Sequence, residues 1–204
     1  MIKEIKDFKR IDIFNHYHQC DNPFIILTTS IDVTNVINYC KKNKMFYATL
    51  GYIITKTTNQ IDAFKYRYSN SKFYYCDELA SNYTQMFDDE TIGYFSVPYN
   101  KDINIYRNEF TKVEREFKEK KKYDSTEKLD EIWLSCSPWF SFNSLISPFN
   151  KKITIPQFIW DKYELKNDKY YINLMIMIHH GFADGLHISR FINKLKENIN
   201  SLKI

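Results

Sequence analysis

Apolar residues along the chain form two kinds of pattern, continuous runs and helical repeats, which together indicate a domain that mixes strands and helices. The clearest run, residues 171–178, has the length of a buried strand and lies between a charged segment and a glycine. The clearest repeat follows it, with apolar residues at +3, +4, +7 and +11 at Ile188, Phe191, Ile192, Leu195 and Ile199. The sequence therefore predicts a strand, a tight turn and an amphipathic C-terminal helix.

The rest of the chain continues this mixture. Apolar and β-branched runs predict strands within 24–31, 83–87, 92–97, 132–139 and 153–160, and a hairpin from 65–68 and 72–76. Helical spacing predicts a short helix within 8–17, one after Asp32, and longer ones over 46–63 and 102–123, with a loop over 124–130. Antiparallel pairing is expected to dominate the sheet.

The turn between the last strand and helix holds the candidate chemistry. Two of the four glycines in the chain, Gly181 and Gly185, enclose Asp184 just after His179 and His180. Neighbouring residues on a strand point to opposite faces, so we expect one working histidine. A neutral imidazole held in a tight turn is suited to act as a general base near pH 7.

Two other interpretations of the turn stay open. The histidines could be core or strand-end residues with satisfied hydrogen bonds, and the glycines could simply make the turn. A metal site would need His180, Asp184 and His187 to converge, yet no Cys or Glu joins them at ligand spacing. We expect no metal.

Composition limits the class of protein. A chain of 204 residues and 24.7 kDa fits a single domain over 1–204. A net charge of +4 with scattered lysines does not favour nucleic-acid binding, and no apolar run reaches the ~20 residues that span a membrane. Four widely spaced cysteines and the lack of an apolar signal region predict a reduced, cytoplasmic protein.

The spacing His-His-x-x-x-Asp-Gly-x-His over 179–187 resembles the signature of the type A chloramphenicol acetyltransferases, and its shorter form recurs in the wider acyl-CoA-dependent acyltransferases. The resemblance includes residues 134–142 and 190–195 and runs through nearly the whole chain. It implies the coenzyme A-dependent acyltransferase fold, an α/β (α+β) two-layer sandwich with a mixed, largely antiparallel sheet and helices on one face. It also implies a homotrimer with sites at subunit interfaces.

The resemblance implies a reaction, acetyl transfer from acetyl-CoA to the 3-hydroxyl of chloramphenicol in a ternary complex. His180 would be the general base, Ser135 would stabilise the oxyanion, and Arg10 would pair with Asp184 to hold the turn. Considered without the resemblance, Arg10 reads as a surface charge and Ser135 as an ordinary strand serine. Ser135 is not a hydrolase nucleophile, because Gly-x-Ser-x-Gly is absent.

The remaining site residues also come from the resemblance. Those expected at the acceptor are Tyr17, Ile25, Ile92, Trp133 and Phe149, and those expected at the donor are Tyr47, Trp139, Ile159, Lys162 and Tyr163.

Several positions depart from the family pattern. Ile159 stands where the family has threonine, and Trp133, Ile92 and Phe149 stand where Asn, Phe and Val are typical. At the start of the helix predicted over 46–63, Met45 and Ala48 replace a lysine and a proline. These departures leave open a different hydroxyl acceptor, and Ile159 also leaves open a non-catalytic binding protein on the same scaffold.

Overall fold

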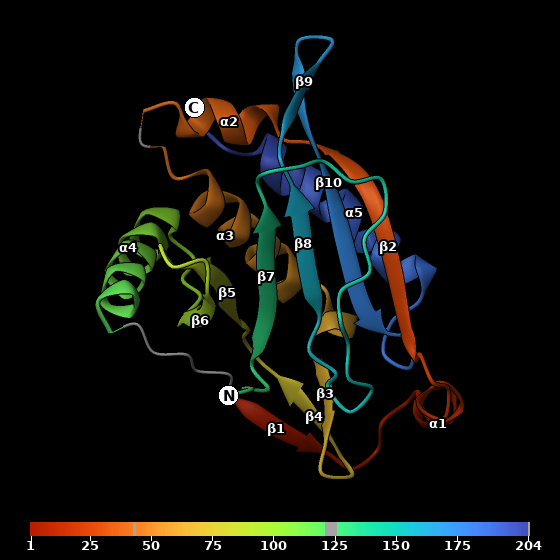
Figure 1. Cartoon of the computed structure of the whole chain (residues 1–204). Coiled ribbons are helices and arrows are strands. Elements are labelled where there is room, and N and C mark those ends of the chain that lie inside the picture. The colour runs from red at the N-terminus through yellow and green to blue at the C-terminus, as the bar shows by residue number, and fades with distance from the viewer. Residues whose placement is uncertain (43, 121–125, 204) are drawn as a thin grey trace.

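The computed structural model describes residues 1–42, 44–120 and 126–203, which form a mixed sheet with helices packed on one side of it (Figure 1). The strands are β1 (Ile2–Ile5), β2 (Phe24–Asp32), β3 (Tyr66–Ser69), β4 (Lys72–Cys76), β5 (Ala80–Met86), β6 (Ile92–Val97), β7 (Glu131–Ser137), β8 (Gln157–Asp161), β9 (Glu164–Lys166) and β10 (Lys169–His179). The helices are α1 (Ile11–His18), α2 (Thr34–Cys40), α3 (Phe46–Asn59), α4 (Ile103–Lys120) and α5 (Gly185–Asn200).

The large sheet has the strand order β2-β10-β8-β7-β5-β6, with β9 paired to β10. Two neighbouring pairs, β5 with β7 and β7 with β8, run parallel, and the other pairs run antiparallel. The expected sheet, mixed but largely antiparallel, is therefore confirmed.

The main core lies between this sheet and the helices α2, α3 and α5 behind it (Figure 1). Along β10, Ile176 and Ile178 are buried in that core, whereas Met175 and Met177 are buried on the opposite face. Because both faces of β10 are covered, its sequence is continuously apolar instead of alternating.

We call the side of the sheet away from the helices the open face. Residues 138–156, the cover segment, cross part of it in front of β8 and β10 (Figure 1). Phe142 and Leu145 of this segment pack against Met175, Met177 and Phe24. The cover segment thus closes one end of the open face, and a cavity lies between Ser147 and Pro148 of this segment and the strands β5 to β8.

A second, three-stranded sheet with the order β1-β4-β3 supports α1. Phe73 on β4 contacts Phe8 and Phe14, with ring centroids 4.6 and 4.8 Å apart, and Phe182 lies against both. The sequence analysis expected the hairpin of β3 and β4 but not its pairing with β1. This aromatic cluster places α1 beside the turn that follows β10.

The predicted strand 153–160 is wrong in its first half, since β8 begins only at Gln157. Pro156 has no N–H to donate to a neighbouring strand. Thr154 turns instead towards β3, where its hydroxyl accepts a hydrogen bond from the Tyr68 N–H at 2.9 Å.

One helix end also differs from expectation. Helix α3 stops at Asn59, and a 3₁₀ turn at Asp62–Phe64 follows it. Helix α4 begins at Ile103, and its predicted end at Tyr123 lies outside the described residues, as does part of the predicted loop 124–130. Within the described parts of the chain, no helix combines the length and apolar character needed to cross a membrane.

Candidate functional site

The turn between β10 and α5 is held by hydrogen bonds at the first residues of the helix. Asp184 is the N-cap of α5, where its Oδ1 accepts hydrogen bonds from the Leu186 N–H at 3.1 Å and from the His187 Nδ1 at 2.8 Å. Gly181 is required for close packing, because a Cβ there would lie 2.7 Å from the Cα of Phe14. The turn is therefore fixed from the helix side and from α1.

His180 follows the end of β10 and is half-buried. Its Nδ1 lies 3.1 Å from the carbonyl oxygen of Ala183, and its ring stacks on Tyr17 with centroids 3.8 Å apart and planes at 9°. A carbonyl oxygen can only accept, so Nδ1 carries the proton and Nε2 keeps its lone pair. His180 is thus held in the tautomer that a general base needs.

His179 points into the protein and is fully buried. Its Nδ1 accepts a hydrogen bond from the Gly181 N–H at 3.1 Å, and its ring stacks on Phe14 at 4.7 Å. Burial, together with smaller effects of the nearby His18 and His180, lowers the pKa of His179 to about 3. The two adjacent histidines therefore differ in environment, and His179 is a neutral packing residue.

Arg10 joins α1 to the turn, as the resemblance implied. Its Nη1 lies 3.1 Å from Oδ2 of Asp184, and its Nε donates to the carbonyl oxygen of Gly181 at 3.3 Å. Partial burial acts to raise the pKa of Asp184, but hydrogen bonds from His187 and Arg10 outweigh this effect and lower the pKa to about 2. Asp184 is therefore ionised at neutral pH and keeps both partners.

The residues that a metal site at the turn would need have other partners. His187 is bound to Asp184, and His180 faces Ala183. Over the described ranges, no group of three or more His, Cys, Asp or Glu residues could hold a metal ion.

Ser135 lies elsewhere, on the open face in the middle of β7. The strand register places Ser135 beside Ile159 and Trp133 beside Gln157. These side chains line a cavity of about 410 Å³ together with Thr84 and Ile92. The structure therefore brings together four predicted site residues, Ser135, Trp133, Ile92 and Ile159.

Gln157 lines the same cavity but was not predicted as a site residue. A glutamine at the start of a strand carries no signal in the sequence, and only the register places it in the same wall as Ser135.

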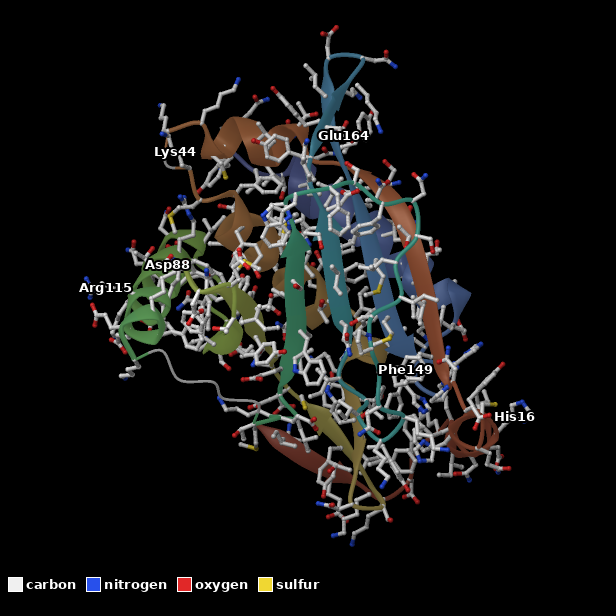
Figure 2. The ribbon with its side chains drawn as sticks, in the orientation of Figure 1. His16, Lys44, Asp88, Arg115, Phe149 and Glu164 are labelled. Atoms are coloured by element: carbon white, nitrogen blue, oxygen red, sulfur yellow. The ribbon has the colours of Figure 1, made fainter. Side chains whose placement is uncertain are left out.

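The predicted donor-side residues lie at the ends of β7 and β8. Ser137 pairs with Asp161, so Trp139, Lys162 and Tyr163 emerge at the same end of the sheet. Trp139 is 63% exposed and Tyr163 is 44% exposed. Figure 2 labels Glu164 at this end and His16 of α1 at the other.

Tyr47 of α3 reaches the sheet from the helix side. It packs on Trp160 and donates its hydroxyl hydrogen to the carbonyl oxygen of Thr84 at 2.8 Å. Its contact with a donor molecule stays a prediction.

The other predicted acceptor residues lie near His180. Tyr17 stacks on the ring of His180, and Ile25 of β2 pairs with Ile178. Phe149 of the cover segment, labelled in Figure 2, packs on Phe24 with ring centroids 5.4 Å apart. The predicted acceptor wall is therefore divided into one part at His180 and another at Ser135.

His180 and Ser135 of one chain cannot reach the same atom. Ser135 is level with Ile159 on β8 and with Met175 on β10. The two strand spacings from β7 to β10 place Ser135 about 10 Å to the side of Met175. His180 lies five residues beyond Met175 along the chain, about 17 Å further in the direction of the strand. A site that uses both groups needs a second copy of the chain.

Comparison with known proteins supports one family. The family model described as chloramphenicol acetyltransferase matches residues 2–196. Chloramphenicol acetyltransferase 3 from Escherichia coli is 26% identical over 97% of this chain and 96% of its own length. A chloramphenicol acetyltransferase from Staphylococcus aureus is 29% identical over 95% of this chain and 93% of its own length.

Solved structures show the same fold. A chloramphenicol acetyltransferase superimposes with a TM-score of 0.83 at 19% identity, covering 98% of this chain and 100% of that one. A truncated catalytic core of the 2-oxoacid dehydrogenase multienzyme complex from Thermoplasma acidophilum superimposes with a TM-score of 0.70 at 16% identity, covering 98% and 99%. The expected coenzyme A-dependent acyltransferase fold is thus confirmed. Because the family model matches nearly every residue, the chain belongs to the chloramphenicol acetyltransferase family.

Proposed function

We propose that the protein transfers the acetyl group of acetyl-CoA to a primary hydroxyl, the 3-hydroxyl of chloramphenicol. The observation that carries this proposal is the state of His180, whose Nδ1–H is bound to Ala183 while Nε2 is free to accept a proton. Nε2 takes the hydroxyl proton as the oxygen attacks the thioester carbonyl. Collapse of the tetrahedral intermediate breaks the C–S bond, and the coenzyme A thiolate takes the proton back from His180.

Ser135 stabilises the negative charge on the oxygen of that intermediate. Its hydroxyl lines the cavity, and one such donor contributes about 3 kcal/mol to transition-state stabilisation where this has been measured. The transfer is direct and forms no acyl-enzyme. Burial raises the pKa of the neighbouring Cys136 to about 12, and Asp161 contributes to the rise, so this thiol stays protonated and unreactive.

The active enzyme is a homotrimer in which His180 of one subunit meets Ser135 of the next. The separation of about 20 Å between the two positions within one chain supports this arrangement. Tyr17, Ile25 and Phe149 then contribute the acceptor wall from the first subunit, and Trp133 and Ile92 contribute it from the second.

Acetyl-CoA enters from the end of the sheet where Trp139, Lys162 and Tyr163 emerge. Lys162 offers a cation for phosphate, and the exposed rings of Trp139 and Tyr163 offer stacking surface. Ile159 lies deeper, beside Ser135 and the proposed place of the thioester, whereas Tyr47 packs against Trp160 on the helix side of the sheet. All four cysteines are free, which fits a reducing cytoplasm.

A second candidate is acetyl transfer to a different hydroxyl acceptor. The lining of the cavity favours it, since Trp133, Ile92 and Ile159 give this wall a shape and polarity that differ from the family pattern.

The deciding experiment measures thiol release from acetyl-CoA with chloramphenicol and with a panel of other primary alcohols. Release with chloramphenicol, lost in His180→Ala, supports the first candidate. Release only with another alcohol supports the second. Absence of release with every acceptor in the folded protein contradicts both and leaves a binding protein.

A further inference from the structure

Gln157 lies in the wall of the cavity with an unusual combination of properties. Its residue is only 7% exposed, and its side chain makes no hydrogen bond with any of the residues that the structure describes. A side-chain amide offers two N–H donors and one carbonyl acceptor. The amide opens into the cavity and has no partner there among the described residues, so it is available to hydrogen-bond a bound molecule.

The strand register fixes where this amide lies. Gln157 is level with Trp133 on β7 and with Met177 on β10, and Ser135 is level with Ile159, one row further on. Residues two apart on a strand share a face, so Gln157, Ile159 and Ser135 all point to the open face. Rows two residues apart are separated by about 7 Å.

The direction of the strands places Gln157 on one side of the reacting centre. β7 and β8 run parallel, and their ends lead to Trp139, Lys162 and Tyr163. Along the direction of both strands, the level of Gln157 and Trp133 comes first and the level of Ser135 and Ile159 comes second. The end of the sheet proposed to bind acetyl-CoA comes last. With the thioester carbonyl at Ser135, Gln157 lies on the acceptor side.

We propose that Gln157 is a specificity-determining residue that hydrogen-bonds the acceptor. This inference rests on the proposed function. It defines the substrate class as a primary alcohol that carries a second hydrogen-bonding group within about 7 Å of the acylated oxygen. An alcohol without that group displaces water from the amide and forms no hydrogen bond with it. The amide then stays unpaired in the complex, so such an alcohol binds more weakly.

The test uses Gln157→Met, which keeps the length of the side chain and removes its hydrogen bonds. Chloramphenicol carries an amide and a second hydroxyl near its primary hydroxyl, and 3-phenylpropan-1-ol has neither. The variant should lower kcat/KM for chloramphenicol about tenfold, through KM, because one neutral hydrogen bond is lost. The values for 3-phenylpropan-1-ol and the KM for acetyl-CoA should stay within twofold of wild type.

A second measurement needs no turnover. Gln157→Met should weaken calorimetric binding of chloramphenicol about tenfold, because one neutral hydrogen bond is lost, and should leave binding of 3-phenylpropan-1-ol within twofold of wild type. The matched control is Gln85→Met, where the amide donates to the carbonyl oxygen of Met86 at 2.8 Å. This control should leave the binding of both alcohols unchanged.

Three results would overturn the inference: unchanged kcat/KM for chloramphenicol, an equal loss of activity with both alcohols, or a rise in the KM for acetyl-CoA. If the wild-type protein acetylates neither alcohol, the proposed function fails separately. Calorimetric binding of the two alcohols to wild type and Gln157→Met then still decides the role of Gln157.

Discussion

At the scale of single residues, the two neighbouring histidines have opposite environments. His180 is half-buried with a free Nε2, and His179 is buried with its Nδ1 bound to the Gly181 N–H. The same strand geometry that sends one side chain outward sends the other into the protein. Chemistry and packing are thus separated between two adjacent positions.

His180→Ala should lower kcat by about 10²–10⁴-fold with little change in Tm, because general base catalysis has this size and no neighbouring group replaces it. His179→Ala should mainly lower the Tm, since it leaves a cavity beside Phe14. Steady-state kinetics and melting of both variants check this division. Equal losses of activity in two folded variants would contradict it.

Ile159 lies beside Ser135 in the cavity wall, where a threonine of similar shape would add a hydroxyl. Ile159→Thr should raise kcat for chloramphenicol several-fold, up to about tenfold, since one hydrogen bond contributes about 0.5–1.5 kcal/mol. The Tm should change little. Unchanged or lower turnover in a well-folded variant would mean that the wall is adapted to another acceptor.

At the scale of elements, α1 holds the turn between β10 and α5 in place. Arg10 at its start bonds Gly181 and Asp184, and Tyr17 near its end stacks on His180. His18, the last residue of α1, lies 3.4 Å from His179 through their ring nitrogens. Both ends of the helix therefore control the position of the base.

The ion pair between Arg10 and Asp184 predicts a dependence of stability on pH. The pKa of Asp184 is about 2 in the folded protein and 3.8 in the reference state, so its contribution to stability is complete above pH 3.8 and is lost as pH falls through 2. Arg10→Ala should lower the Tm at neutral pH by about 2–6 °C, a modest loss because both partners are partly exposed.

The Tm difference between wild type and Arg10→Ala should narrow between pH 4 and pH 2. Lys9→Ala, at an exposed neighbouring position, is the control, and its Tm should equal that of wild type at both ends of this pH range. Wild-type melting and turnover in Arg10→Ala across this range would show that the pair does not hold the turn.

At the scale of the whole molecule, the sheet keeps the two proposed catalytic groups apart. Ser135 is central on the open face, and His180 is at one end of β10. A closed ring of identical subunits brings unlike surfaces together, so each interface can combine one of each group. Every subunit would contribute to two sites.

Mixed trimers test this arrangement directly. His180→Ala and Ser135→Ala proteins should each be nearly inactive, and unfolding and refolding them together in equal amounts should restore about a quarter of wild-type activity, since random assembly makes that share of interfaces complete. The measurement is activity of the refolded mixture against each variant refolded alone. Activity that does not exceed the sum of the two variants would place both groups in one subunit's site.

The sequence alone determined the elements and the turn. Continuous apolar runs and helical repeats are local, so they located β10, α5 and most other elements, and the histidine motif located the candidate base. Errors occurred where non-local contacts decide, as at Thr154, which bonds β3 instead of extending β8. The pairing of β1 with β4 was missed for the same reason, because a four-residue edge strand has little pattern of its own.

Only the tertiary structure decided which side chains share a wall. Strand order and register place Ser135, Ile159 and Gln157 in one cavity, although 22 positions of chain separate Ser135 from Gln157. Hydrogen bonding decided the state of His180, because its proton position depends on the Ala183 carbonyl across the turn. Both properties come from contacts between segments that fold together, and no local pattern of residues specifies them.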